Sequence, residues 1–229
     1  MTGFSPRIHP PGIITRWFPG AFWKLNPHEK NVYLTFDDGP IPGITPWVLD
    51  LLQKEDVRST FFCVGENVVR HPDIYNQIIH MGHSVGNHTY NHLKGRSSSA
   101  EEYYASIEAA AEHIDSDLFR PPHGLMTIEQ YRYLSEHYKI IMWDIVSHDF
   151  DRNSTPEQVF ENVNRFVSNG SIITFHDSVK AFPNLKMALP RVIKMLKDKG
   201  YTMDPIPYSG KEDILLQQEK HTGSFFRAS

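Results

Sequence analysis

The sequence predicts an α/β fold of about seven parallel strands joined by crossover helices, either an incomplete TIM-like barrel or an open doubly wound sheet. Three observations support this. Short apolar, β-rich runs recur along the chain, most of the intervals between them have apolar residues three and four positions apart, and chemically capable side chains follow the runs. The 229 residues contain no repeat or linker, so we expect one domain.

The predicted elements alternate in order along the chain. The strands are the apolar runs at residues 31–37, 59–64, 83–87, 117–120, 139–144, 171–175 and 201–204. The helices are the periodic segments at residues 45–57, 71–82, 99–114, 127–138, 155–167 and 184–200. Several of them begin with a start signal, as in Thr155, Pro156 and Glu157, and Pro190 is expected to kink or divide the last one.

The two ends of the chain differ from this pattern. Residues 1–27 form an arm rich in proline and aromatic residues, which we expect to pack on the domain. The alternative is a foot on a membrane surface, made by Trp17, Phe18, Phe22 and Trp23. Residues 206–229 form a polar tail, either disordered or a terminal helix. No run approaches the roughly 20 apolar residues of a transmembrane helix. No export signal is evident, which favours the cytoplasm or the inner face of a membrane.

Composition excludes several classes of function. The chain has 23 basic and 27 acidic residues, and no basic run is interleaved with aromatic residues, so nucleic-acid binding is not expected. Cys63 is the only cysteine and lies in a predicted strand. A disulfide framework and a thiolate metal site are therefore excluded, and any metal must use histidine and carboxylate ligands. The sequence does not indicate an oligomeric state.

Side chains capable of chemistry follow the predicted strands. The carboxyl ends of parallel strands share one face, where active sites are built, whereas residues placed for stability would scatter to both faces. This clustering predicts an enzyme. The residues are Asp37 and Asp38, His88, Arg120, Asp144 and Asp149, and His176 with Asp177.

The motif TFDDGP places two carboxylates, Asp37 and Asp38, after a buried strand. Like charges this close need a cation, a proton or solvent. The motif HTYNH places His88 and His92 four apart, on one face if they lie on a helical turn, which is the spacing for binding one metal ion. Either aspartate could complete a set of three protein ligands, as in catalytic zinc sites, and leave its neighbour free as a base.

Two further motifs offer partners for this chemistry. Arg120, in FRPPHG, could hold the free aspartate ionised and oriented, and the backbone N–H groups of His123 and Gly124 could face an oxyanion. A carboxylate such as Asp149 should raise the pKa of His176, which suits a group that protonates a leaving amine.

The ordered motifs TFDDGP, HTYNH, RPPHG, WDIVSHDF and TFHDS resemble those of the polysaccharide deacetylase family, also called the NodB-homology or carbohydrate esterase family four domain, over residues 28–205. The resemblance implies a distorted (β/α)7 TIM-like barrel and metal-dependent removal of acetyl groups from amino sugars in a chitin-like or peptidoglycan-like glycan. By this match, Asp37 is the general base, Arg120 its tether, His176 the general acid and Asp149 its tuning carboxylate. Asp38, His88 and His92 match the metal ligands, most often for zinc, with cobalt or nickel as alternatives.

Three positions depart from the family pattern. His123 stands where an aromatic residue, often tyrosine, is usual, Phe150 where tryptophan is usual, and Thr174 where an aliphatic residue is usual. With Pro122 and Gly124 they are the predicted substrate-binding residues, so the substrate stays open. Two alternatives remain: an amidohydrolase acting on a formyl group or a non-sugar amide, and a catalytically silent carbohydrate-binding protein.

Overall fold

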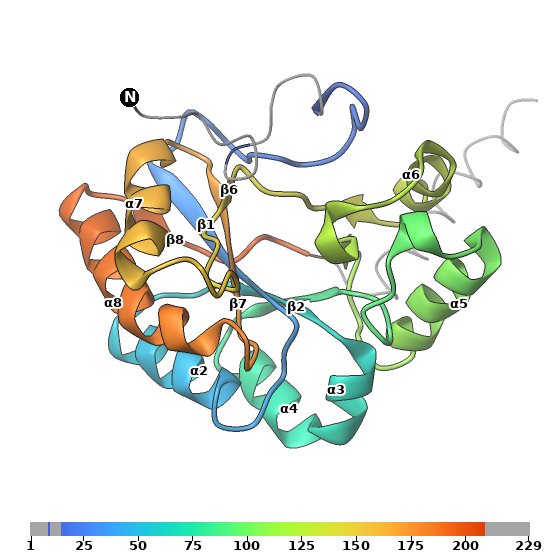
Figure 1. The fold of residues 1–229 in the computed structure, drawn as a ribbon, viewed down its shortest axis with the longest axis horizontal. Coiled ribbons are helices and arrows are strands. Elements are labelled where there is room, and N and C mark those ends of the chain that lie inside the picture. The colour runs from blue at the N-terminus through green and yellow to red at the C-terminus, as the bar shows by residue number, and fades with distance from the viewer. Residues whose placement is uncertain (1–8, 10–14, 209–229) are drawn as a thin grey trace, which may run out of the picture.

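A curled parallel sheet with helices packed around it forms the centre of the molecule (Figure 1). The computed structural model describes His9 and residues 15–208, so most of the predicted tail lies outside the described residues. In Figure 1, helices α2, α7 and α8 lie to the left of the sheet, and α5 and α6 to its right. The predicted fold class, a distorted barrel of parallel strands, is confirmed.

The sheet has eight strands in the order β5-β4-β3-β2-β1-β7-β6, with β8 paired to the start of β1. All of these pairs are parallel. The strands are β1 (Asn31–Asp37), β2 (Thr60–Cys63), β3 (Ser84–Asn87), β4 (Leu118–Phe119), β5 (Lys139–Ile140), β6 (Ile145–Val146), β7 (Ile172–His176) and β8 (Thr202–Met203).

The helices follow the predicted periodic segments, with one addition. Helix α3 directly follows β2 and was not predicted, because its six residues are too few to show a helical period. The α-helices are α2 (Thr45–Lys54), α3 (Gly65–Arg70), α4 (Pro72–His80), α5 (Ala100–Ala111), α6 (Ile128–Ser135), α7 (Pro156–Phe166) and α8 (Phe182–Asp198). Two 3-10 turns, η1 (Gly95–Ser97) and η2 (Pro122–Gly124), complete the set.

Helix α8 contains Pro190 in its interior and is not divided by it. One face of the helix is fully buried against the core, through residues such as Leu189, Val192 and Ile193. That burial stabilises one continuous helix although proline removes a backbone hydrogen bond. Of the two outcomes predicted for Pro190, a kink or a division of the last helix, division does not occur.

The central strand β1 is buried at all seven positions. A parallel strand covered on both faces is expected to be apolar throughout rather than alternating. Val32, Leu34 and Phe36 are all fully buried, and Phe36 stacks between Phe61 and Phe175 of the two neighbouring strands. This packing fixes the position at which β1 ends, and so the position of the two carboxylates at that end, Asp37 and Asp38.

The predicted strand at residues 139–144 is not one strand: only Lys139 and Ile140 belong to a strand, β5 at one edge of the sheet, and β6 begins just beyond the range, at Ile145, on the opposite edge. β5 pairs with β4, and β6 pairs with β7. Between them the backbone pairs with the N-terminal arm, because Phe22 donates to the Ile140 carbonyl at 2.8 Å and accepts from the Met142 N–H at 2.8 Å. Residues 140–143 are all apolar, so the pattern between Lys139 and Asp144 could not reveal the change of partner.

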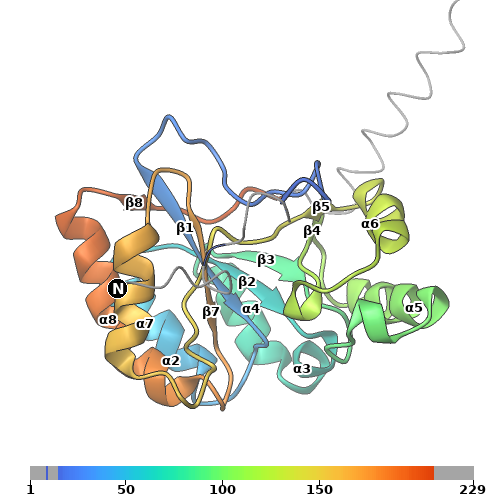
Figure 2. The same ribbon diagram turned by 45° about the horizontal axis from the view of Figure 1, so that its top comes forward.

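The described part of the N-terminal arm packs on the domain (Figure 2). Phe18 is buried and meets Tyr131 edge-on, with ring centroids 5.0 Å apart. The Gly20 N–H donates to the Tyr131 hydroxyl at 2.6 Å. Trp17 is 61% exposed, but with Phe18 buried the four aromatic residues cannot all serve as a membrane foot. Among the described residues, no helix is long and apolar enough to cross a membrane.

Candidate functional site

The first group at the site is the ion pair between Asp37 and Arg120. Asp37 is the last residue of β1, and its Oδ1 accepts a hydrogen bond from Arg120 Nη1 at 2.7 Å. Arg120 is fully buried and also donates to Thr35 Oγ1 and to the carbonyls of Ile141 and Met142. These contacts fix the guanidinium, which in turn fixes the direction of the carboxylate.

The second group is a cluster of one carboxylate and two imidazoles. The side chains of Asp38, His88 and His92 place one ligand atom each within 4.8 Å of one another. Asp38 Oδ1 lies 3.2 Å from His92 Nε2 and 4.0 Å from His88 Nε2. Asp38 adopts a positive φ of 85°, and its carbonyl accepts from Asn67 Nδ2 at 2.8 Å, so the backbone holds the side chain toward the histidines.

The two histidines do not lie on a helical turn, contrary to the spacing argument. They follow β3 in an irregular loop where Thr89 and His92 have positive φ angles of 63° and 57°. Side chains close this loop: Asn87 Oδ1 accepts from the Thr89 N–H, and Thr89 Oγ1 accepts from the Leu93 N–H. The loop still brings the two rings together, with centroids 5.1 Å apart.

The chemistry of this cluster fits a divalent cation. His88 Nδ1 lies 2.8 Å from the Arg120 carbonyl, an arrangement in which Nδ1–H donates and Nε2 keeps its lone pair toward Asp38. Burial, together with the nearby His92, lowers the pKa of His88 to about 4, so the ring is neutral near pH 7. Asp38 Oδ1 is buried without a hydrogen-bond partner among the described residues. Burial opposes ionisation of Asp38, but contact with His92 and the charge of His176 hold its pKa well below its usual range.

The third group is the pair of His176 and Asp149. Asp149 is fully buried, its Oδ1 lies 2.8 Å from His176 Nδ1, and its Oδ2 accepts from the His176 N–H at 2.8 Å. Burial alone would lower the pKa of His176, but the charge and hydrogen bond of Asp149 outweigh it and raise the pKa to about 9. His176 is therefore protonated near neutrality and can donate a proton. Phe150 meets its ring edge-on at 4.8 Å.

Asp177 has no predicted role, yet it organises the turn that carries the aspartates. It is fully buried; Oδ1 accepts from the Gly39 N–H at 3.0 Å and Oδ2 from the Thr45 hydroxyl at 2.5 Å. Burial raises the pKa of Asp177 to about 8. A Cβ on Gly39 would lie 2.0 Å from Asp177 Oδ2, so only glycine fits there. The signal in the sequence for a role of Asp177 was that this acidic residue directly follows His176.

Asp144 lies at the opposite end of the sheet from the other predicted residues. It precedes β6, and its carboxylate contacts Lys24 Nζ at 3.1 Å and Ser171 Oγ at 2.5 Å. The expectation that Asp144 shares the face of the active site is wrong, because β5 ends at Ile140 and Asp144 directly precedes the first residue of β6 instead of following a strand. It anchors the N-terminal arm instead.

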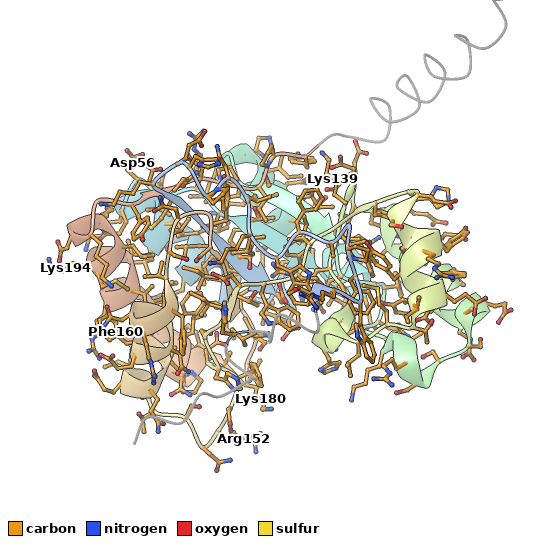
Figure 3. All side chains as sticks on the ribbon, turned by 90° about the horizontal axis from the view of Figure 1, so that it is seen from above. Asp56, Lys139, Arg152, Phe160, Lys180 and Lys194 are labelled. Carbon is orange, nitrogen blue, oxygen red and sulfur yellow. The ribbon has the colours of Figure 1, made fainter. Side chains whose placement is uncertain are left out.

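The three groups surround one pocket of about 830 Å³. Asp37, Asp38, His88, His92 and His176 line it, while Arg120 and Asp149 lie behind them, and the exposed Lys180, labelled in Figure 3, lies at its rim. Of the predicted substrate-binding residues, His123, Gly124, Phe150 and Thr174 line the pocket. Sequence reasoning missed an apolar part of the wall, formed by Phe18, Trp23, Leu125, Met142, Trp143 and Val146.

Two details of the loop after β4 differ from the prediction. Pro122 is buried and does not line the pocket, whereas Pro121 does. The Gly124 N–H donates to the Pro121 carbonyl at 2.9 Å, so it is engaged within the turn. Of the two N–H groups considered for the oxyanion, that of His123 stays the candidate.

Comparison with known proteins gives a consistent result. A family model described as polysaccharide deacetylase matches residues 24–138. A peptidoglycan-N-acetylglucosamine deacetylase from Bacillus cereus is 32% identical over 201 residues, which cover 85% of this chain and 91% of that protein. The peptidoglycan-N-acetylmuramic acid deacetylase PdaA from Bacillus subtilis is 28% identical over 211 residues, covering 87% and 76%.

A solved structure shows the same fold. The crystal structure of the Bc1960 peptidoglycan N-acetylglucosamine deacetylase, in complex with an aromatic N-hydroxyamide, superposes with a TM-score of 0.79. The two chains are 29% identical, and the match covers 86% of this chain and 95% of that one.

Proposed function

Because this chain belongs to the polysaccharide deacetylase family, we propose that it is a metal-dependent hydrolase that removes N-acetyl groups from amino sugars of peptidoglycan. One observation carries the proposal: three groups of side chains surround a single pocket. They are Asp37 with Arg120, the cluster of Asp38, His88 and His92, and His176 with Asp149. These groups can supply the base, cation site and acid that amide hydrolysis needs.

Asp38, His88 and His92 would hold the cation, with zinc the first choice and cobalt or nickel as alternatives. When bound, the cation supplies Lewis acidity, which polarises the amide carbonyl and lowers the pKa of water. The buried Asp38 oxygen without a partner and the neutral His88 support this assignment.

The protein's own groups perform the proton transfers. Asp37, oriented by Arg120, accepts a proton from the attacking water. The His123 N–H would donate to the developing oxyanion. His176, protonated through Asp149, donates to the sugar nitrogen as the C–N bond breaks, because an amine leaves poorly without that proton.

Peptidoglycan is the proposed substrate because the two curated relatives described above are named as peptidoglycan deacetylases, one for each amino sugar. A chitin-like glycan is the alternative. Location in the cytoplasm or at the inner face of a membrane stays a prediction, and fractionation of cells that express the full chain would test it.

The test is acetate release from peptidoglycan fragments and N-acetylglucosamine oligomers, with and without added zinc, cobalt or nickel. We expect metal-dependent acetate from at least one glycan and none from the His88→Ala variant. Formate release, or cleavage of a non-sugar amide only, would assign a related amidohydrolase. Glycan binding without acetate release by the metal-loaded protein would instead assign a carbohydrate-binding protein.

A further inference from the structure

The N-terminal arm supplies part of the pocket wall. Phe18 and Trp23 line the pocket together with Met142 and Trp143, which lie in the crossing between β5 and β6. Trp23 and Trp143 meet edge-on, with ring centroids 6.2 Å apart and an angle of 66° between the ring planes. Both are only partly buried, so each keeps surface available for contact.

The arm is held at this place by several independent contacts. The backbone of Phe22 makes two hydrogen bonds to the crossing, to Ile140 and from Met142. Lys24 forms an ion pair with the buried carboxylate of Asp144 at 3.1 Å. Trp23, between these two anchors, is therefore a fixed part of the wall rather than a loose residue near the pocket.

A series of contacts connects this aromatic pair to the candidate metal ligands. The rings of His92 and His123 lie 4.7 Å apart, and His123 precedes Gly124. A Cβ at Gly124 would lie 2.1 Å from the Trp143 ring, so that indole packs directly on the loop that bears His123. Trp143 is thus adjacent to the predicted position of the scissile amide, and Trp23 extends the same wall outward.

The pocket is larger than an acetamide group needs. Its volume of about 830 Å³ lies in the range of pockets that hold whole ligands. The C–H face of a sugar ring packs well on an indole, because the ring face carries partial negative charge.

We propose that Trp23 and Trp143 form a subsite for a second sugar unit, next to the sugar that loses its acetyl group. The arm is then part of the substrate-binding surface, and it makes the protein prefer oligomers over single sugars. This inference rests on the proposed hydrolase function.

The experiment compares wild type, Trp23→Ala and Trp23→Phe on N-acetylglucosamine monomer and tetramer. The ratio of kcat/KM for tetramer to that for monomer should fall by about tenfold in Trp23→Ala, mainly through KM, with partial recovery in Trp23→Phe. Trp17→Ala is the matched control, because Trp17 lies on the same arm, is exposed and does not line the pocket.

A second readout does not depend on turnover. Titration of the same tetramer into metal-free protein by calorimetry should give weaker binding for Trp23→Ala than for wild type and Trp17→Ala. Thermal unfolding of each variant shows whether the arm stays folded, and Trp23→Phe carries the test if Trp23→Ala does not fold. An unchanged length ratio and unchanged binding in folded variants would overturn the subsite while leaving the hydrolase intact. No acetate from wild type on any glycan would instead overturn the proposed function.

Discussion

Arg120 Nη1 lies 2.7 Å from Asp37 Oδ1, and the guanidinium that makes this contact is completely buried. The rest of the guanidinium is held by Thr35 and by the carbonyls of Ile141 and Met142, with the Phe62 ring 4.1 Å from its centre. Asp37, the proposed base, is thus oriented by a firmly held group, since five contacts from three segments of the chain restrain the guanidinium.

Replacement of Arg120 should damage stability and activity together. Arg120→Gln leaves the Asp37 carboxylate buried without a cation, which typically costs about 3–5 kcal/mol of unfolding free energy. Arg120→Lys keeps the charge but loses the planar fork, so we expect intermediate stability and still a large loss of kcat. Thermal or urea unfolding with kcat measurements checks this, and a fully active, fully stable Arg120→Gln would show that the pair does not orient the base.

Metal binding and proton transfer should separate between two variants. His88→Ala removes one of the proposed ligands, so zinc affinity and acetate release should both be lost. Asp37→Asn keeps the ligands, so zinc affinity measured by calorimetry should stay within a few fold, while kcat falls by about 10²–10⁴. Full activity in Asp37→Asn would mean that another group is the base.

Activity should fall as the pH rises through about 9, because His176 must be protonated to act as the acid and its pKa is raised to about 9. The same raised pKa contributes stability that is fully present below the ordinary value of 6.5 and is lost as the pH rises through about 9.

Asp149→Asn removes the charge that raises this pKa, so the alkaline limb of kcat/KM should move to lower pH. Asp151→Asn is the control, because Asp151 also lines the pocket, whereas Asp149 is the carboxylate that is hydrogen-bonded to His176. If the alkaline limb of kcat/KM stays at the same pH in Asp149→Asn, the loss of activity at high pH comes from a group other than His176.

The turn held by Asp177 should govern metal affinity without touching the metal. Thr45→Val removes the hydroxyl that donates to Asp177 and accepts from the partly buried Ile41 N–H. The buried Asp177 oxygen is left unpaired, at a cost of about 1–3 kcal/mol. We expect lower stability and at least a roughly tenfold weaker zinc affinity. Thr45→Ser keeps the hydroxyl and should recover both; equal affinities in the two variants would limit Thr45 to a structural role.

Gly39→Ala tests the same turn from the backbone side. Its Cβ would lie 2.0 Å from Asp177 Oδ2, so the turn or the carboxylate must move, at a cost of about 1–3 kcal/mol. Zinc affinity and kcat should fall with stability. Retained affinity in a destabilised variant would mean that Asp38 is positioned independently of Gly39, through Asn67 alone.

The sequence by itself determined the fold class and the chemistry available to it. Alternation of apolar runs with helical segments gave the parallel sheet, because a strand covered on both faces must be apolar throughout. Residues directly after those strands had to meet on one face, and Asp37, Asp38, His88 and His176 do line one pocket.

Only the tertiary structure decided which segments of the chain pair through backbone hydrogen bonds, and therefore which side chains share the pocket. The run from Lys139 to Val146 leaves one sheet edge for the other, because the N-terminal arm supplies the hydrogen bonds between β5 and β6. That crossing takes Asp144 away from the site and brings Trp23 and Trp143 into its wall. Such contacts join residues more than a hundred positions apart, and local pattern carries no information about them.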